Sequence, residues 1–335
     1  MNPSDLLFRA ATAADLPAFE RLAAASAIGI TTLPADRAKL ATRLAHAAHA
    51  FASGDDSSGE EIYLFVLEHE GRIVGTSGIA ASAGFADRFY SYRNEMVVHA
   101  SAALSARNRI HTLHLCHDLT GHTLLTSFFI DPAYADTVAP QLLSRARLLF
   151  IAEFAERFSD RIAAENPGLA DEQGRSPFWD AVGRRFFAMD YPVVEQITGG
   201  RSKAFIAELM PQSPIYVPLL PEAAQWAIGQ LHPEAELPFS ILIDEGFDTE
   251  TYVDIFDGGA TVDARVAMLR TVAQSRGVDA APNAALGSWH LAANTRRGDF
   301  RATLCEALDP ATLQRLEARP GERLRVAPLN APEAA

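Results

Sequence analysis

The residue with the clearest potential for chemistry is His232, in the stretch 229–233 that reads Gly-Gln-Leu-His-Pro. A proline-led segment at 221–231 predicts a helix, so His232 is expected at or just past its C-terminus. There the helix dipole favours the protonated imidazole. Because histidine titrates near neutral pH, His232 is a candidate proton donor. The alternative is a histidine that only caps the helix.

A second candidate feature is the strand, loop and helix predicted for residues 124–158. The run LLTSFFI predicts a buried strand that ends at Pro132, since proline cannot donate to a strand ladder. After a loop at 133–140, a long helix is expected, with Arg145 and Arg147 off its buried face. The first N–H groups of such a helix have no helical partner and can hold an anion. The alternative is an ordinary strand-to-helix connection. The buried face is expected to consist of Leu142, Ala146, Leu149, Phe150 and Phe154.

Charged residues also interrupt the segment 89–101, which reads FYSYRNEMVVHAS. Its aromatic residues alternate with polar ones, and this pattern predicts a strand. Two interpretations stay open for that strand. Arg93, Asn94 and Glu95 either face a substrate or lie on a half-exposed surface strand.

Cys116 and several histidines lie within residues 111–122, a combination that invites a metal site. The spacing matches no familiar zinc pattern, and a second pair of ligands is missing. We therefore predict no metal. Asp118 and Gly121 instead indicate a turn that joins two antiparallel strands.

Composition narrows the classes of protein to which this chain can belong. A chain of 335 residues is expected to form one to three domains, and its 48% hydrophobic content is ordinary for a globular protein. The net charge of -13 disfavours non-specific nucleic-acid binding. Two distant cysteines predict no disulfide framework and fit a reducing cytosol. We find no apolar run that could span a membrane and no signal peptide.

The rest of the pattern predicts a mixed α+β chain. Two strands at 61–68 and 73–80 with Glu70-Gly71 between them indicate a hairpin. Serine followed by proline at 176–177 predicts a helix start. We expect a large domain at 1–253 and a small β-rich C-terminal module at 254–335 that ends in a frayed tail.

Several long motifs, in order, resemble the arginine N-succinyltransferase family, most closely the alpha subunit of the arginine/ornithine form. The resemblance covers nearly the whole chain up to about residue 275. The segments that carry it are GITTLP (29–34), FYSYRNEMVVHAS (89–101), CHDLTG (116–121), SPFWDAVGRRFFAMD (176–190), AFIAELMP (204–211), GQLHP (229–233) and YVDIFDGG (252–259).

The resemblance implies transfer of a succinyl group from succinyl-CoA to the α-amino group of L-arginine or L-ornithine, the first step of a catabolic route. It also implies an acyl-CoA N-acyltransferase (GNAT-like) fold, a mixed sheet flanked by helices. By the resemblance, His232 is the proton donor and Phe128 contacts succinyl-CoA. We further expect Arg93, Glu95 and Asp118 to bind the substrate. Direct attack of the amine on the thioester needs neither a metal nor a covalent enzyme intermediate.

The loop at 133–140 departs from the usual pattern of such acyltransferases. It has no glycine to let backbone approach a diphosphate closely, and Asp136 would repel phosphate. Two hypotheses follow. The chain is either a working succinyltransferase subunit, or a catalytically weak structural or regulatory partner of a competent beta subunit. In both cases we expect a hetero-oligomer with the beta subunit, in the cytoplasm.

Overall fold

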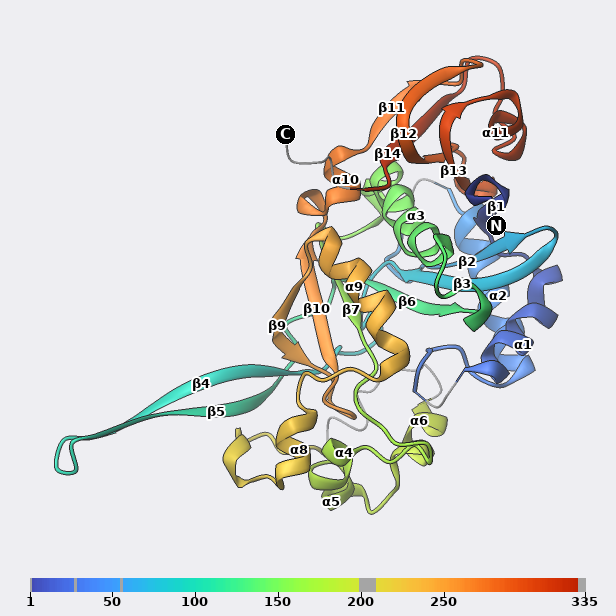
Figure 1. The fold of residues 1–335 in the computed structure, drawn as a ribbon. Coiled ribbons are helices and arrows are strands. Elements are labelled where there is room, and N and C mark those ends of the chain that lie inside the picture. Colours follow the sequence, from blue (N-terminus) through green and yellow to red (C-terminus); the bar gives the residue numbers. More distant parts are fainter. Residues whose placement is uncertain (1, 27–28, 55–56, 199–208, 331–335) are drawn as a thin grey trace.

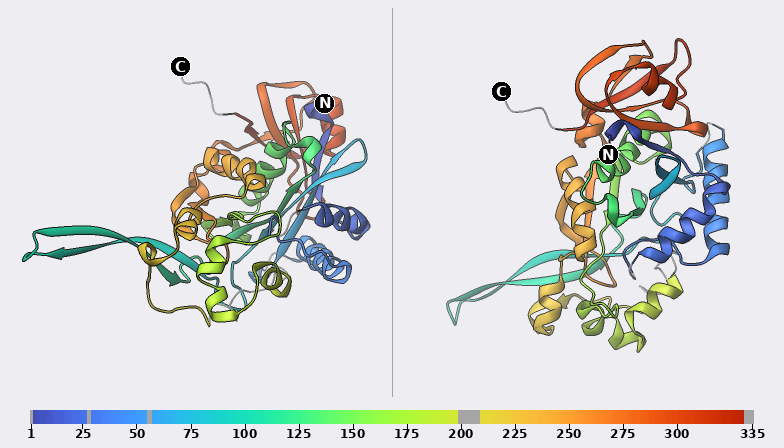
Figure 2. Two further views of the ribbon diagram at one scale, coloured as in Figure 1. Left: turned by 60° about the horizontal axis from the view of Figure 1, so that its bottom comes forward. Right: turned by 45° about the vertical axis from the view of Figure 1, so that its right-hand side comes forward.

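A single mixed sheet runs through the chain and carries the site on its middle strands. The structure is a computed structural model that describes residues 2–26, 29–54, 57–198 and 209–330. In this part of the chain, fourteen strands follow one another in the order β11-β14-β12-β13-β1-β2-β3-β6-β7-β10-β9-β4-β5-β8. Figures 1 and 2 show helices packed around the middle of the sheet and a ribbon that projects from one end.

The strands range from two residues in β8 to eleven in β4 and β5. They are β1 (Leu6–Ala10), β2 (Ile62–His69), β3 (Arg72–Ala80), β4 (Ser91–Ser101), β5 (Ala106–Cys116), β6 (Thr123–Ile130), β7 (Arg161–Glu165), β8 (Ile215–Tyr216), β9 (Asp248–Val253), β10 (Ala260–Arg265), β11 (Arg276–Asp279), β12 (Ala284–Ala293), β13 (Arg301–Leu308) and β14 (Arg323–Pro328).

Four of the described helices have ten or more residues, namely α1, α2, α3 and α9, and the others are shorter. The described α-helices are α1 (Leu16–Ala25), α2 (Arg37–Ala52), α3 (Ala139–Glu153), α4 (Pro177–Ala181), α5 (Arg184–Phe187), α6 (Tyr191–Thr198), α8 (Glu222–Ala227), α9 (Glu236–Glu245), α10 (Arg270–Gln274) and α11 (Pro310–Arg315).

The hairpin of β2 and β3 begins the central sheet, as predicted. Glu70 and Gly71 at its turn both have positive φ values, 50° and 76°. Two such residues in succession match the twist of antiparallel strands, and glycine makes the second position inexpensive. The hairpin then places β3 beside β6.

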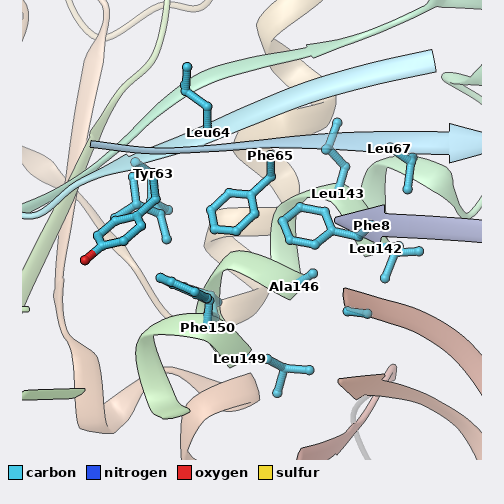
Figure 3. Close-up of a cluster of buried hydrophobic side chains, with 14 of the residues drawn as sticks. Phe8, Tyr63, Leu64, Phe65, Leu67, Leu142, Leu143, Ala146, Leu149 and Phe150 are labelled. Carbon is cyan, nitrogen blue, oxygen red and sulfur yellow. The ribbon is translucent and has the colours of Figure 1, made fainter. Parts of the chain in front are cut away.

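The main hydrophobic core lies between this sheet and α3, which confirms the predicted strand, loop and helix. Figure 3 shows Phe150 of α3 beside Tyr63 and Phe65 of β2, with Phe8 of β1 next to them. Phe150 is fully buried and its ring centroid lies 5.1 Å from that of Phe65. This aromatic cluster anchors α3 to the strands and so fixes the loop that precedes the helix.

The predicted place of two arginines on α3 is wrong. Arg145 and Arg147 are expected off the buried face, yet both are 3% exposed. The helix is covered on nearly all sides, by the sheet on one and by α9, α10 and the C-terminal strands on others. A helix in the middle of a domain has no solvent face on which to place a charge.

The predicted strand at 89–101 is confirmed as β4, which pairs with β5 along its whole length. Neighbouring strands reach only the base of this ribbon. β9 pairs with Tyr92 and Arg93, and β8 pairs with Thr112 and Leu113. Beyond that point, no other described strand pairs with the ribbon, which extends from the body in all three views (Figures 1 and 2). We call residues 94–111 the arm.

The turn at 117–122 joins β5 to β6, and the prediction that it links two paired strands is wrong. β5 pairs with β4 and β8, whereas β6 pairs with β3 and β7. A turn residue such as Gly121, with a φ of 85°, indicates that the chain reverses there, but it does not indicate which strands pair.

At the C-terminal end, β11 to β14 continue the sheet beyond β1. β10 lies in its middle, between β7 and β9. The division into a domain at 1–253 and a module at 254–335 stays a prediction. The motif AFIAELMP (204–211) falls largely outside the described residues.

Candidate active site

The site begins where two middle strands separate. β6 and β7 are parallel, and they pair only through Thr123, Leu124 and Leu125. β7 ends at Glu165, whereas β6 continues to Ile130. The strands therefore form a wedge that opens beyond the last paired residue. Among the described strands this is the one parallel pair.

A bulge lies on β6 at the mouth of this wedge. Gly78 of β3 pairs with Thr126 and Thr76 pairs with Phe129, so Ser127 and Phe128 together oppose one residue. Ser127 has a φ of 55°, an uncommon value for a residue other than glycine. Bulges of this kind turn backbone groups away from the ladder, often at sites of function.

The loop before α2 closes over the bulge. The backbone N–H of Ser127 donates to Oγ1 of Thr32 at 3.1 Å, and the two hydroxyl groups also lie 3.1 Å apart. The Ser127 carbonyl accepts a bond from the Thr76 hydroxyl at 3.1 Å. The 29–34 segment thus contacts β6 at Ser127, the residue before Phe128.

A pocket of about 930 Å³ extends from the wedge. Its wall includes β6 with Phe128, the end of β7, the loop at 29–36, and Arg147 of α3. Most of the charged groups among its described lining residues are acidic, since the basic side chains among these residues are Lys39 and Arg147. The acidic lining residues are Asp36, Asp136, Glu165, Glu234, Asp254 and Asp257.

His232 lies beside this pocket, next to the lining residues Pro233 and Glu234. Its backbone N–H donates to the carbonyl of Pro167, another lining residue, at 2.9 Å. Its Nδ1 accepts the N–H of Glu234 at 3.2 Å. In that geometry the ring proton is on Nε2, so the half-buried imidazole keeps Nε2–H as its free donor.

The predicted position of His232 at a helix C-terminus is wrong. α8 ends at Ala227, and the chain then bends at Gly229, whose N–H donates to the carbonyl of Gly258. His232 is the N-cap of the short 3₁₀ turn Pro233–Ala235, which leads into α9. It therefore caps a different element from the predicted one, and it lies beside the pocket. The proton-donor role stays a prediction.

The three residues predicted to bind substrate contact one another. Nε of Arg93 donates to Glu95 at 2.5 Å and its Nη1 donates to Asp118 at 2.7 Å. The hydrogen bond to Asp118, and after it the bond to Glu95, raise the pKa of Arg93 above its ordinary value. The cluster lies at the base of the arm, and none of the three is among the residues that line the pocket. Their substrate role stays a prediction.

The loop at 133–140 offers few donors to a phosphate. The N–H of Ala139 donates to Thr137 Oγ1 at 3.1 Å, and that of Gln141 to the carbonyl of Val138. Pro140 has no N–H, and Asp136 lines the pocket. The start of α3 therefore satisfies its own backbone groups.

In the part of the chain that the structure describes, no three His, Cys, Asp or Glu side chains are grouped as metal ligands would be. No described helix is both long and apolar enough to cross a bilayer. Cys116 and Cys305 are both buried and unbridged.

Sequence reasoning missed Arg147 and Thr32. A signal for Arg147 was present, because residues 142–151 read LLSRARLLFI, with no polar face on which an arginine could reach solvent. Thr32 gave no signal, since its contact with Ser127 joins residues distant in sequence.

Comparisons with known proteins decide the family. A sequence profile described as arginine N-succinyltransferase beta subunit matches residues 6–271. The arginine N-succinyltransferase subunit alpha of Pseudomonas aeruginosa is 50% identical over 307 residues, 90% of each chain. This chain belongs to the arginine N-succinyltransferase family.

Within this family, the subunit beta of the same organism is 41% identical over 344 residues, which cover 97% of this chain and 99% of that one. The arginine N-succinyltransferase of Salmonella paratyphi B is 39% identical over 96% of each chain. A solved structure of arginine/ornithine succinyltransferase subunit AI from Pseudomonas aeruginosa superposes with a TM-score of 0.89 at 44% identity, and covers 98% of this chain. The predicted family and fold class are confirmed.

Proposed function

We propose that this chain transfers the succinyl group of succinyl-CoA to the α-amino group of L-arginine, or of L-ornithine, as the first step of an arginine catabolic route. The observation that carries the proposal is the family match over nine-tenths of the chain, at 50% identity to a subunit alpha. The pocket at the open wedge of β6 and β7 is consistent with it.

The reaction needs three things from the protein. The amine nitrogen attacks the thioester carbonyl, a C–N bond forms, the C–S bond breaks, and CoA leaves as a thiolate. The amine must lose a proton, the carbonyl oxygen needs hydrogen-bond donors as charge develops, and the thiolate needs a proton.

The bulge at Ser127 and Phe128 is the proposed place of the thioester. Backbone there leaves the regular ladder and faces the wedge, so N–H groups near Phe128 are the proposed donors to the carbonyl oxygen. His232 is the proposed acid for the thiolate. It would act as the imidazolium, in which Nδ1 carries a proton and gives up the bond from the Glu234 N–H, because a neutral ring does not release its Nε2 proton to a thiolate.

The acidic lining of the pocket supports a cationic acceptor. Carboxylates attract a guanidinium or an ammonium group, and the lining holds more of them than of basic groups. The ion-paired cluster of Arg93, Glu95 and Asp118 remains the second candidate for acceptor binding, at the base of the arm.

We propose a beta-type subunit as the partner, and the arm as the surface that holds it. The arm carries Arg107 and Arg109 and no acidic residue between 96 and 111, and its Met96 and Val98 are exposed by 54% and 46%. Residues 209–264 contain no lysine or arginine and many exposed carboxylates. A chain that carries an equally acidic segment is therefore the partner that the basic arm would fit. A two-stranded ribbon alone is marginal in water, which favours a covered arm.

The cytoplasm is the proposed compartment. Two buried and unbridged cysteines fit a reducing environment.

The test is an assay of the purified chain, with and without a beta subunit. Succinyl-CoA and L-arginine should yield free thiol and N-succinylarginine, identified by mass spectrometry, and an arginine blocked on its α-amino group should yield none. Thiol release without a succinylated amine, in either preparation, would refute the proposal. Activity only with beta present would favour the supporting-subunit alternative.

A further inference from the structure

Arg147 is a buried cation that faces the pocket without an acidic partner. Its side chain is 3% exposed, yet it belongs to the pocket lining. Its Nε donates to the carbonyl of Ser144 at 3.1 Å and its Nη2 to the Ser144 hydroxyl at 3.0 Å. No described carboxylate lies within ion-pair distance of it.

Other buried arginines of this chain are paired. Arg145, on the same helix, meets Glu245 at 2.8 Å and the carbonyl of Leu329 at 2.7 Å. Arg157 donates to the Tyr63 hydroxyl at 2.6 Å and lies 3.6 Å from Glu61. A buried charge without a counter-ion destabilises the fold. Arg147 is therefore the one of these three whose charge remains for a ligand to balance.

The position of Arg147 indicates which anionic group of the ligand it would bind. Its guanidinium carbon lies 5.5 Å from the centroid of the Phe128 ring, on the bulge where the thioester is proposed to lie. The start of α3, where such folds hold a diphosphate, is about 12 Å away along the helix axis. In succinyl-CoA the anion nearest the thioester is the free carboxylate, two methylene groups away.

We propose that Arg147 binds the terminal carboxylate of the succinyl group and so selects a dicarboxylic acyl donor. An arginine can hold a carboxylate through two parallel N–H bonds, whereas a neutral acyl chain would leave the guanidinium unpaired. This inference rests on the proposed function and deepens it, because it assigns the residue that distinguishes succinyl-CoA from neutral acyl-CoA donors.

The protonation state agrees with this role. Burial lowers the pKa of Arg147 to about 9, and no acid offsets that effect. The group is still a cation at pH 7, ready to pair with an anion.

The test compares two donors of equal chain length, succinyl-CoA and butyryl-CoA, in which a methyl group replaces the carboxylate. The variants are Arg147→Met, Arg147→Gln and Arg147→Lys, all assayed with L-arginine. Lys39→Met is the matched control, since Lys39 is the other cation of the lining. The assembled enzyme is used if the chain needs its partner.

The expected result is a change of selectivity. Arg147→Met and Arg147→Gln should reduce kcat/KM for succinyl-CoA about 100-fold or more and leave that for butyryl-CoA equal or higher. Arg147→Lys should retain part of the preference, and Lys39→Met should keep the wild-type ratio of the two donors. The melting temperature of Arg147→Met should not fall, since the change removes an unpaired buried charge.

Equal losses with both donors would overturn the inference, because Arg147 would then hold a group common to all CoA esters or support the fold. An unchanged preference for succinyl-CoA in Arg147→Met would overturn it as well. A wild-type enzyme that does not use succinyl-CoA would instead refute the proposed function, so the two failures are distinguishable.

Discussion

At the scale of single residues, two side chains divide the work of the proposed site. His232 is oriented by the backbone on both sides, since its own N–H donates to Pro167 and its Nδ1 accepts from Glu234. Arg147 lies deeper, on α3, with Ser144 as its hydrogen-bond partner. We propose that the first moves a proton and that the second binds an anion.

His232 can be tested against its capping role. Asparagine is also a good N-cap but is no acid, so His232→Asn keeps the cap, whereas His232→Ala loses both functions. We expect both variants to lower kcat about 10²- to 10⁴-fold with succinyl-CoA. A succinyl thioester of an acidic aryl thiol should be affected much less, because that thiolate leaves without a proton. Steady-state kinetics with both donors provide the readout.

Full activity of His232→Asn would contradict the proton-donor role. It would mean that the histidine only begins the turn before α9, and that another group protonates the thiolate.

Arg147 predicts a pH dependence with a defined sign. Because burial lowers its pKa to about 9, the guanidinium loses its proton above that pH and can no longer bind a carboxylate. The ratio of kcat/KM for succinyl-CoA to that for butyryl-CoA should be constant near neutral pH and fall above about pH 9. Taking the ratio removes the titration of the amine acceptor, which both donors share.

A ratio that stays constant to pH 10 would contradict this prediction. Arg147→Met serves as the control, since its ratio should not change across the same range.

At the scale of elements, the predicted segments depended on local patterns, and these succeeded. The β2–β3 hairpin was recognisable from Glu70-Gly71, and α3 from its apolar spacing after Pro132. Patterns of this kind reflect neighbours in sequence. They could not reveal that β6 pairs in parallel with β7, or that α3 is covered on nearly all sides, because both depend on distant segments. The errors over Arg145, Arg147 and the turn after Cys116 follow from that.

The site was predicted to a similar degree. His232 and Phe128 were named through the family resemblance, and both are at or beside the pocket. The position of His232 relative to a helix was wrong, because the bend at Gly229 separates it from α8. Arg93, Glu95 and Asp118 were expected to bind the substrate. They contact one another outside the pocket lining, and their substrate role stays a prediction.

The charge of the loop at 133–140 is expected to affect the KM for succinyl-CoA. Asp136 is exposed at the pocket edge and would repel the diphosphate of CoA. Asp136→Asn should therefore lower the KM for succinyl-CoA about 2- to 5-fold at low salt, and less at high salt, where screening weakens the repulsion. Initial rates at two salt concentrations measure it.

Asp160→Asn is the matched control, because Asp160 is also exposed but does not line the pocket. If both variants change the KM alike, only net charge matters and the local role of Asp136 is refuted.

At the scale of the whole molecule, the arm is the feature that the rest of the described chain leaves uncovered. It carries apolar Met96 and Val98 beside Arg107 and Arg109 on a ribbon that only its base ties to the sheet. The double variant Met96→Asp, Val98→Asp should abolish assembly with the beta subunit, because it places two charges in the exposed apolar part of the arm. Sedimentation velocity of the coexpressed chains measures it.

Met268→Asp is the control for adding charge at an exposed apolar residue, since Met268 is 73% exposed and lies outside the arm. An intact complex in the arm variant would show that another surface holds the partner.

We propose that this chain carries its own succinyl-CoA site, although its loop at 133–140 lacks glycine. Calorimetric titration of the purified chain alone with succinyl-CoA tests this proposal. We predict saturable binding at one site per chain, weakened in Arg147→Met. No binding by the chain alone, with binding restored when a beta subunit is added, would contradict the claim and make this chain the supporting partner.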